Sequence, residues 1–171
     1  MKKIALIYSF NTRKTTQAAE KIAHEFGNDI EKINAETLTE EQFLSYNKMI
    51  LGVPTWFDGE LPNYWDEFVP AIEDMDLKGK TIALFGNGNQ KGYPENFVDG
   101  IGIMTGLLKS RGAKIIGFTS AKDFQFESSK ALLDGEFTGL ALDFENHASQ
   151  VSGRVKKWVE QLKKEFPPKK S

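Results

Sequence analysis

Cysteine is absent from the 171 residues, and histidine occurs only as His24 and His147. Disulfides, thiolate metal sites, iron–sulfur clusters and a cysteine nucleophile are therefore excluded, as is a metal centre built from several histidines. No apolar run approaches the roughly 20 residues that a membrane-spanning helix needs. The N-terminus begins like a signal peptide, but its apolar stretch is short and no small-residue cleavage site follows it. We therefore expect a cytoplasmic protein without membrane insertion.

An excess of charge of one sign is also missing. The chain has 22 basic and 24 acidic residues, for a net charge of −2, which gives no reason to expect nucleic-acid binding. The length and composition predict a single globular domain over residues 1–171. Charge is uneven along the chain, because residues 56–76 carry seven acids and no base, whereas residues 156–171 carry six lysines.

Short apolar runs alternate with amphipathic segments along the chain. The runs predict buried strands at residues 4–8, 49–53, 81–86 and 114–118, with an edge strand at 29–34. The amphipathic segments predict helices at residues 15–26, 39–44, 64–72, 97–111 and 151–166, the third of them interrupted by Pro70. This alternation predicts an α/β fold: an open, doubly wound, five-stranded parallel sheet with helices on both faces.

In such sheets ligands bind beyond the carboxyl ends of the strands, so the loops after Tyr8, Val53 and Phe85 are the first candidates. The first loop is rich in hydroxyl groups and enters a helix, an arrangement that suits a phosphate. An ordinary threonine-capped helix start is the alternative. The candidate residues of this loop are Ser9, Phe10, Asn11, Thr12, Arg13, Lys14 and Thr15.

The second and third loops combine aromatic residues with glycine and proline. The candidates are Pro54, Thr55, Trp56, Phe57, Asp58 and Gly59 in the second loop, and Asn87, Gly88, Asn89, Gln90 and Tyr93 in the third. Aromatics packed beneath a loop, and glycines that serve ordinary turns, are the alternatives. Two aromatics on neighbouring loops beside a phosphate loop nevertheless favour a planar ring with a phosphate tail, such as flavin mononucleotide (FMN).

Several motifs together resemble the long-chain flavodoxins over almost the whole chain. They are Pro54-Thr55-Trp56 with Gly59-Glu60-Leu61-Pro62, Gly92-Tyr93-Pro94, Phe126-Glu127-Ser128-Ser129, Gly139-Leu140-Ala141-Leu142-Asp143, and Arg154 with Trp158. The resemblance implies strand order 2-1-3-4-5 and non-covalent FMN between Trp56 and Tyr93. It also implies Asp143 among the cofactor-binding residues, and an insertion at residues 120–139 that splits the last strand.

The first loop departs from the family pattern, which places a hydroxyl where Phe10 stands and a glycine where Arg13 stands. We expect Arg13 and Lys14 to reach the phosphate instead, through charge-assisted hydrogen bonds. Asn89 and His147 replace the more usual aspartate and glutamine. The family pattern further implies that the peptide between Phe57 and Asp58 reorients on reduction, with a positive φ at Asp58 in the reoriented turn.

The resemblance implies a low-potential one-electron carrier without catalytic side chains, rather than an enzyme. Its partners would be basic redox proteins, a reductase as donor and an oxidoreductase as acceptor, and the chain would be a monomer. Two other functions stay open at this point. One is an NAD(P)H-dependent quinone or nitro reductase of the same fold, and the other is a non-redox module that binds a planar ligand at a decayed FMN site.

Overall fold

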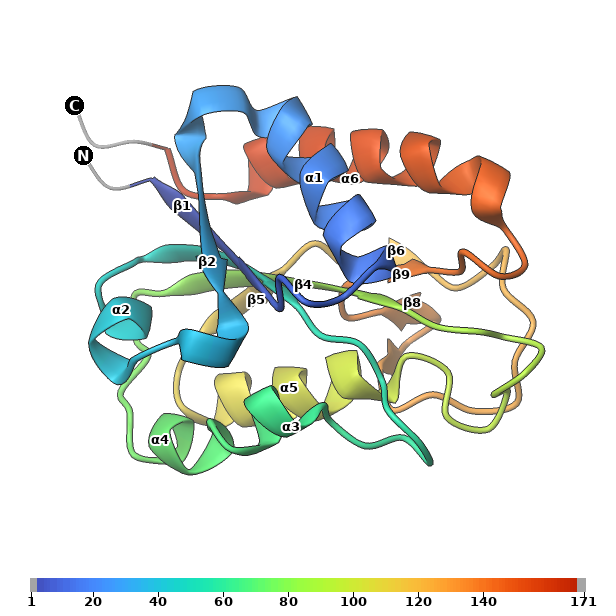
Figure 1. Ribbon diagram of the computed structural model, residues 1–171, viewed down its shortest axis with the longest axis horizontal. Coiled ribbons are helices and arrows are strands. Elements are labelled where there is room, and N and C mark those ends of the chain that lie inside the picture. Colours follow the sequence, from blue (N-terminus) through green and yellow to red (C-terminus); the bar gives the residue numbers. More distant parts are fainter. Residues whose placement is uncertain (1–2, 169–171) are drawn as a thin grey trace.

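A parallel sheet forms the centre of the molecule, with helices on both of its faces (Figure 1). The computed structural model describes residues 3–168, so the outer ends of the predicted domain and of the basic run at 156–171 lie outside the described residues. The strand order confirms the predicted doubly wound sheet. In spatial order the five strands are β2 (Ile30–Asn34), β1 (Ile4–Tyr8), β3 (Lys48–Gly52), β4 (Thr81–Asn87) and β5 (Lys114–Ile116).

Two hydrophobic cores lie on opposite faces of this sheet, because successive residues of a strand point to opposite sides. Ala5 and Ile7 of β1 belong to one core, and Leu6 and Tyr8 belong to the other. The first core is covered by α2 (Glu40–Leu44), α3 (Asn63–Asp66), α4 (Val69–Glu73) and α5 (Asp99–Ser110). The second is covered by α1 (Lys14–Phe26) and α6 (Val151–Glu165), which lie above the sheet in Figure 1.

Strand β4 has two different neighbours on its outer side. Its first residues pair with β5, whereas its last residues pair with β9 (Leu140–Leu142). Between these two strands the chain leaves the main sheet and forms a small antiparallel sheet of β6 (Thr119–Ser120), β8 (Glu136–Phe137) and β7 (Leu132–Leu133). The strand predicted at residues 114–118 therefore ends at Ile116, followed by Gly117 with a φ of 82°.

The segment between β5 and β9 packs on the domain through aromatic side chains. The ring of Phe97, just before α5, lies 5.4 Å from that of Phe124 and 5.5 Å from that of Phe126. Phe137 lies 5.7 Å from Phe97 and is fully buried. These aromatic contacts hold the segment against the core of the domain.

Two helix predictions were wrong in their bounds. The helix predicted at residues 64–72 is two short helices, α3 and α4, and Pro70 lies in the first turn of the second one, where a missing N–H has no cost. The helix predicted from residue 97 begins at Asp99, because Val98 has a left-handed backbone conformation with φ 48°. Helix α2 begins after Thr39, whose side chain and that of Gln42 form a capping box.

Within residues 3–168, three short 3-10 helices complete the fold. They are η1 (Gly27–Asp29), η2 (Ala35–Thr37) and η3 (Ala148–Gln150). The second of these follows β2 directly and lies beside the first of the predicted ligand loops. In the same part of the chain no helix combines the length and apolar character that crossing a membrane requires.

Candidate functional site

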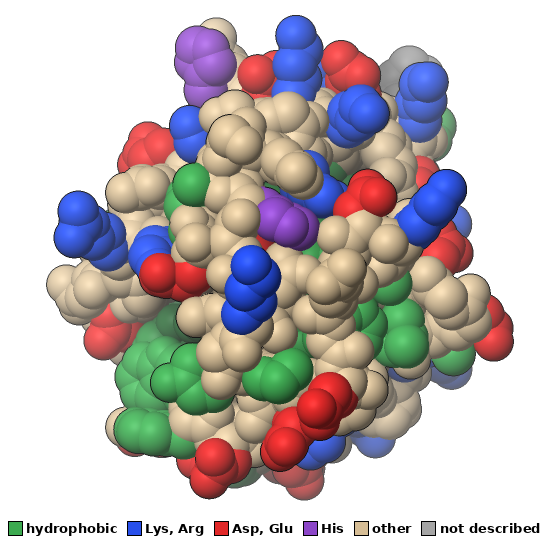
Figure 2. All heavy atoms as spheres, turned by 90° about the vertical axis from the view of Figure 1, so that its right-hand side faces the viewer, with side chains coloured by type: hydrophobic (Ala, Val, Ile, Leu, Met, Phe, Trp, Pro, Cys, Tyr) green, Lys and Arg blue, Asp and Glu red, His purple; other side chains and the backbone are tan. Residues whose placement is uncertain are grey.

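A cavity of about 470 Å³ opens between the second and third loops, beyond the carboxyl ends of β3 and β4. Figure 2 faces this edge of the molecule and shows hydrophobic side chains gathered on one part of it. Phe57 is 76% exposed and Tyr93 is 59% exposed, which is unusual for aromatic side chains. The lining residues are Thr55, Trp56, Phe57, Gly88, Asn89, Tyr93, Asn96 and Val98.

A tight hairpin holds Trp56 at the cavity. The backbones of Trp56 and Glu60 exchange two hydrogen bonds, each 2.7 Å from nitrogen to oxygen. The φ angle is positive at Phe57 (47°) and at Gly59 (89°), whereas the φ angle of Asp58, between them, is not positive. The positive φ predicted at Asp58 concerns a reoriented turn, so that prediction stays open. The ring of Trp56 also packs nearly perpendicular to that of Tyr64, with 6.1 Å between the ring centroids.

The backbone before this hairpin approaches the start of α5 closely. The hydroxyl of Thr55 accepts a hydrogen bond of 2.9 Å from the N–H of Gly100. A side chain at Gly100 would lie 2.8 Å from the carbonyl oxygen of Pro54, so only glycine fits there. Of the predicted second-loop residues, Pro54 and Thr55 therefore fix the loop against α5, and Thr55 lines the cavity together with Trp56 and Phe57.

Asp143 holds the third loop in place from beneath. Its side chain is buried, and one carboxylate oxygen accepts hydrogen bonds from the backbone N–H and the side-chain amide of Gln90, at 3.0 and 2.9 Å. The side-chain amide of Asn146 donates to the same oxygen at 2.8 Å. Burial raises the pKa of Asp143, but the hydrogen bonds from Asn146 and Gln90 outweigh it, and the net pKa is lowered.

Other polar atoms of the third loop are also used within the protein. The side-chain oxygen of Gln90 accepts from the backbone of Gln125, and that of Asn89 accepts from Gly92 and Asn146. The side-chain oxygen of Asn87 accepts from the N–H of Phe144. At Gly88 a side chain would lie 2.8 Å from the ring of Phe97. The loop is thus preformed, and Tyr93 is its exposed aromatic residue.

The donors of the first loop turn toward Glu36 in η2. The hydroxyl of Ser9 and the side-chain amide of Asn11 both donate to the carboxylate of Glu36, the latter at 2.7 Å. The hydroxyl of Thr12 donates to the carbonyl of Ser9 at 2.8 Å. Phe10 is 47% exposed, and its ring lies 5.0 Å from that of Tyr8.

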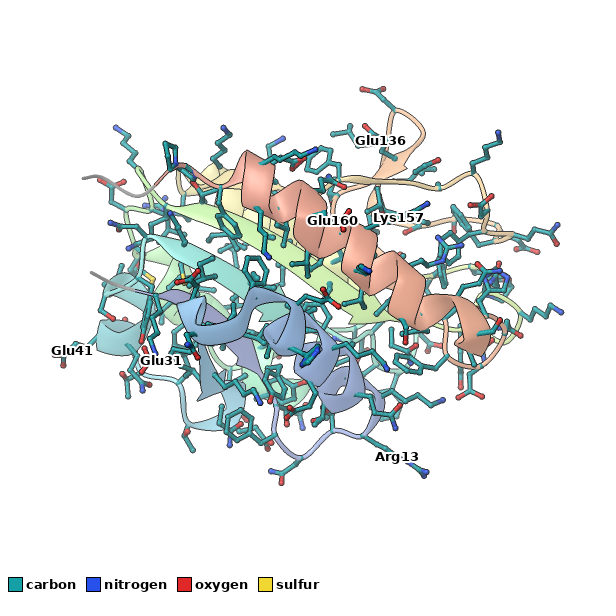
Figure 3. The ribbon with its side chains drawn as sticks, turned by 90° about the horizontal axis from the view of Figure 1, so that it is seen from above. Arg13, Glu31, Glu41, Glu136, Lys157 and Glu160 are labelled. Atoms are coloured by element: carbon teal, nitrogen blue, oxygen red, sulfur yellow. The ribbon has the colours of Figure 1, made fainter. Side chains whose placement is uncertain are left out.

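The two basic side chains of this loop, Arg13 and Lys14, do not turn toward Glu36. Arg13 is exposed and extends away from the body of the protein (Figure 3). The ammonium group of Lys14 forms an ion pair with Glu145, in the segment after β9. Thr15 is buried, and α1 begins at Lys14 with no side-chain hydrogen bond at its cap, so the reading of a threonine-capped helix start was wrong.

Three residues near the site were missed by the sequence argument. Asn96 lines the cavity, and its buried side-chain oxygen has no hydrogen-bond partner among the described residues. Val98 lines it too, in the left-handed conformation that β-branched residues rarely adopt. Glu36 follows a strand without a ligand motif, and only the structure places it, because the last residue of β2 lies in register with the last residue of β1. The segments after these two strands must therefore lie close together.

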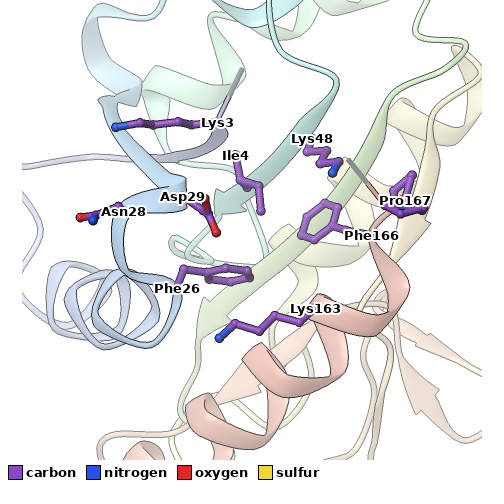
Figure 4. Close-up of a pocket in the computed structure, with 10 residues that line it drawn as sticks. Lys3, Ile4, Phe26, Asn28, Asp29, Lys48, Lys163, Phe166 and Pro167 are labelled. Carbon is purple, nitrogen blue, oxygen red and sulfur yellow. The ribbon is translucent and has the colours of Figure 1, made fainter. Parts of the chain in front are cut away.

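A second cavity, of about 510 Å³, lies at the opposite edge of the sheet (Figure 4). It is lined by Ile4, Phe26 and Phe166 and by lysines that include Lys163. The ammonium group of Lys163 donates to the carbonyl of Glu25 at 3.0 Å. This hydrogen bond satisfies a carbonyl group in the last turn of α1. None of the three predicted ligand loops reaches this cavity, so it is not the predicted site.

The sheet and its cavity define a doubly wound α/β protein with an aromatic-lined cavity beyond the carboxyl ends of two neighbouring central strands. Residues 6–158 match the sequence profile of the family described as Flavodoxin. The chain therefore belongs to the flavodoxin family, as its motifs predicted.

Individual flavodoxins are similar to this chain over nearly its whole length. Flavodoxin from Nostoc sp. is 43% identical over 166 residues, covering 96% of this chain and 98% of its own. Flavodoxin 1 from Escherichia coli is 35% identical over 163 residues, covering 94% and 93%. A crystal structure of Fusobacterium nucleatum flavodoxin bound to FMN has a TM-score of 0.91 at 30% identity, covering 98% of this chain and 100% of that one.

Proposed function

We propose that this protein carries single electrons between redox partner proteins through non-covalently bound FMN. The observation that carries this proposal is the cavity of about 470 Å³ with Trp56, Phe57 and Tyr93 on its walls, at the ligand edge of a flavodoxin-family sheet. The protein is an electron-transfer protein rather than an enzyme. The low potential and the cytoplasmic location remain predictions from the sequence.

The residues at the cavity fit a flavin ring. Such a ring is planar and apolar on its faces and carries polar atoms on its edge. Trp56 and Tyr93 supply aromatic surface for the faces, and the unpartnered oxygen of Asn96 can accept a hydrogen bond from a ring N–H. Gly88 lines the cavity with backbone alone, and a side chain there would clash with the ring of Phe97.

The first loop is the proposed phosphate site. Its backbone N–H groups at the start of α1 have no partners within the helix and can donate to phosphate oxygens. The hydroxyl groups of Ser9, Thr12 and Thr15 and the amide of Asn11 lie in the same loop. Arg13 has a long, exposed side chain and Lys14 is paired with Glu145, so the backbone is the stronger candidate for holding the phosphate.

When bound, FMN supplies the redox chemistry, and the protein tunes it. The aromatic walls exclude water from the ring faces, which disfavours a negative charge on the reduced ring. Asp58, exposed on the hairpin beside the cavity, adds electrostatic repulsion against such a charge. Asn89, which is uncharged, adds none. Asp143 and Gln90 act by holding the third loop, through the hydrogen bonds between them.

The acids beside the hairpin support docking of basic partner proteins. All seven acids of residues 56–76 are exposed. Two of them, Asp58 and Glu60, belong to the hairpin whose Phe57 is 76% exposed. An acidic rim around an apolar centre attracts and orients a partner of opposite charge. We propose that the chain acts as a monomer in these encounters.

The visible absorption spectrum of the purified protein is the direct test. We expect flavin bands with about one FMN per chain, and their stepwise loss when dithionite is added. A colourless protein that develops no bands with added FMN would overturn the proposal and favour a planar ligand other than flavin. Rapid steady-state turnover of NADPH with a quinone would instead favour the reductase alternative.

A further inference from the structure

We infer that the carboxylate of Glu36 competes with the phosphate of FMN for the donors of the first loop. This inference rests on the proposed function, because it concerns the same phosphate site. Its consequence is that Glu36 lowers the affinity for FMN while leaving the affinity for riboflavin, which lacks the phosphate, unchanged. Glu36 therefore sets how strongly the protein discriminates between the two flavins.

The strand register explains why Glu36 lies beside the loop. Strands β1 and β2 are parallel neighbours, and Tyr8 at the end of one pairs with Asn34 at the end of the other. The side chain of Asn34 then bridges the segments after the two strands. Its oxygen accepts from the N–H of Phe10 at 3.3 Å and from the N–H of Glu36 at 3.1 Å. Glu36 is thereby held against the loop.

One oxygen of Glu36 accepts from two side chains of the loop, Ser9 and Asn11. A hydroxyl group has a single hydrogen to donate, so Ser9 cannot donate to Glu36 and to a phosphate oxygen at the same time. Both partners of Glu36 are neutral, and no Lys or Arg within residues 3–168 forms an ion pair with it. The negative charge beside the loop is therefore not neutralised.

The hydrogen bonds from Ser9 and then Asn11 lower the pKa of the Glu36 carboxyl, which keeps it ionised at neutral pH. Its charge also extends toward the aromatic cavity. Burial and then the negative charge of Glu36 raise the pKa of Tyr64, whose ring packs nearly perpendicular to that of Trp56. Glu36 therefore acts on a neighbour of Trp56 as well as on the proposed phosphate loop, and its segment η2 contacts α3, which carries Tyr64.

A phosphate that enters this loop meets a like charge and donors that are already in use. Both effects oppose binding, and neither acts on riboflavin, which has only a hydroxyl group at that end. Glu36 is exposed, so solvent and salt screen its charge and the effect is moderate. Replacing the carboxylate by a neutral amide of the same shape removes the charge and weakens the competition.

The experiment compares FMN and riboflavin binding to the apoprotein of the parent, of Glu36→Gln and of Glu41→Gln, by quenching of flavin fluorescence. Glu41→Gln is the matched control, because it removes the same charge from an exposed site on α2, far from Arg13 in Figure 3. We expect Glu36→Gln to bind FMN about fivefold more tightly at low salt, a gain that salt reduces. Its riboflavin affinity should change by less than about twofold, in line with lost surface charges.

The outcomes separate this inference from the proposed function. Equal FMN affinity in the parent and Glu36→Gln would overturn the inference and leave the function intact. Weaker FMN binding in Glu36→Gln would also overturn it, because the carboxylate would then be ordering the loop for phosphate. Equal gains with riboflavin, or with Glu41→Gln, would show that the effect does not arise at the phosphate. Failure of all three proteins to bind either flavin would overturn the proposed function itself.

Discussion

Gln90 donates both its backbone N–H and its side-chain amide to one carboxylate oxygen of Asp143, across a separation of 53 residues in the sequence. The other carboxylate oxygen accepts from the N–H groups of Glu145 and Asn146. One buried side chain thus joins the loop after β4 to the segment after β9. Tyr93 lies three residues beyond Gln90, so the junction also helps to fix the position of Tyr93.

We expect Asp143→Ala to lower the free energy of unfolding by about 1.5–3 kcal/mol, because it leaves buried donors without their charged acceptor. It should also weaken FMN binding, since the third loop loses its support. Urea unfolding and FMN titration measure the two effects. Asp66→Asn, at an exposed position on α3, is the control and should change neither by more than a few tenths of a kcal/mol.

The lowered pKa of Asp143 gives this prediction a pH dependence. A carboxyl group with a depressed pKa in the folded state contributes stability above its unfolded pKa, about 3.9, and that contribution is lost as the pH falls toward the folded pKa. The stability difference between the parent and Asp143→Ala should therefore be constant from about pH 5 to 7 and shrink below about pH 4. A difference that shrinks near neutral pH would contradict this assignment.

Arg13 gives a prediction about the phosphate. Its side chain is exposed and extends away from the loop. We therefore expect Arg13→Ala to weaken FMN by less than about threefold, as is usual for exposed charges. Riboflavin should bind the parent and the variant equally. A loss of about tenfold or more that is specific to FMN would show that the arginine folds back onto the phosphate in a charge-assisted hydrogen bond, as the sequence suggested.

The sheet was predictable because its central strands β1, β3 and β4 contain continuous apolar runs. The helices were predictable because their apolar residues share one face. The bounds failed where single residues override such patterns. Val98 is apolar and extends the helical pattern of α5, yet its left-handed backbone places it before the helix. Pro70 resembles an interruption of one helix, yet it lies in the first turn of another.

The site was predictable to the level of loops, because the topology brings the carboxyl ends of the strands to one edge. The roles of individual residues were less accessible. Gln90 and Asp143 were both expected at the cofactor, and their polar atoms bind the protein itself. Glu36 follows a strand that carries no ligand motif. Pairing between distant loops depends on strand register, which a single sequence does not specify.

The exposed acids beside the cavity give a prediction about docking. Electron transfer from a basic reductase should slow as salt rises, because the Debye length falls from about 10 Å at 0.1 M to about 3 Å at 1 M. The paired change Glu60→Gln and Asp66→Asn should lower the bimolecular rate and leave FMN bound. Stopped-flow kinetics over a range of salt concentrations measure both effects.

Asp58 is left unchanged in that pair, because a charge beside the cavity also shifts the flavin potential. Potentials measured alongside would separate a change in driving force from a change in encounter rate. A rate that is independent of salt and of the paired change would show that these acids are a solvated surface. The expectation of basic partners would then lose its support.

A substitution at Gly59 tests how the hairpin holds Trp56. Its φ of 89° is unfavourable for any residue with a side chain, and an added Cβ would lie 2.7 Å from a carboxylate oxygen of Asp99. We expect Gly59→Ala to lower the free energy of unfolding by about 1–3 kcal/mol and to weaken FMN by displacing Trp56. Gly135→Ala is the matched control, because its φ is 83° and its Cβ would enter open space.

The two alanine variants share the backbone penalty, so their difference isolates the contact with Asp99 and its effect on the cavity. Gly135→Ala should be destabilised by about 1–2 kcal/mol and should bind FMN as the parent does, because the turn between β7 and β8 does not line the cavity. Urea unfolding and FMN titration on both variants give the comparison. Equal FMN affinity in Gly59→Ala and the parent would mean that the hairpin adapts without moving Trp56, and that the tryptophan is positioned by its contact with Tyr64 instead.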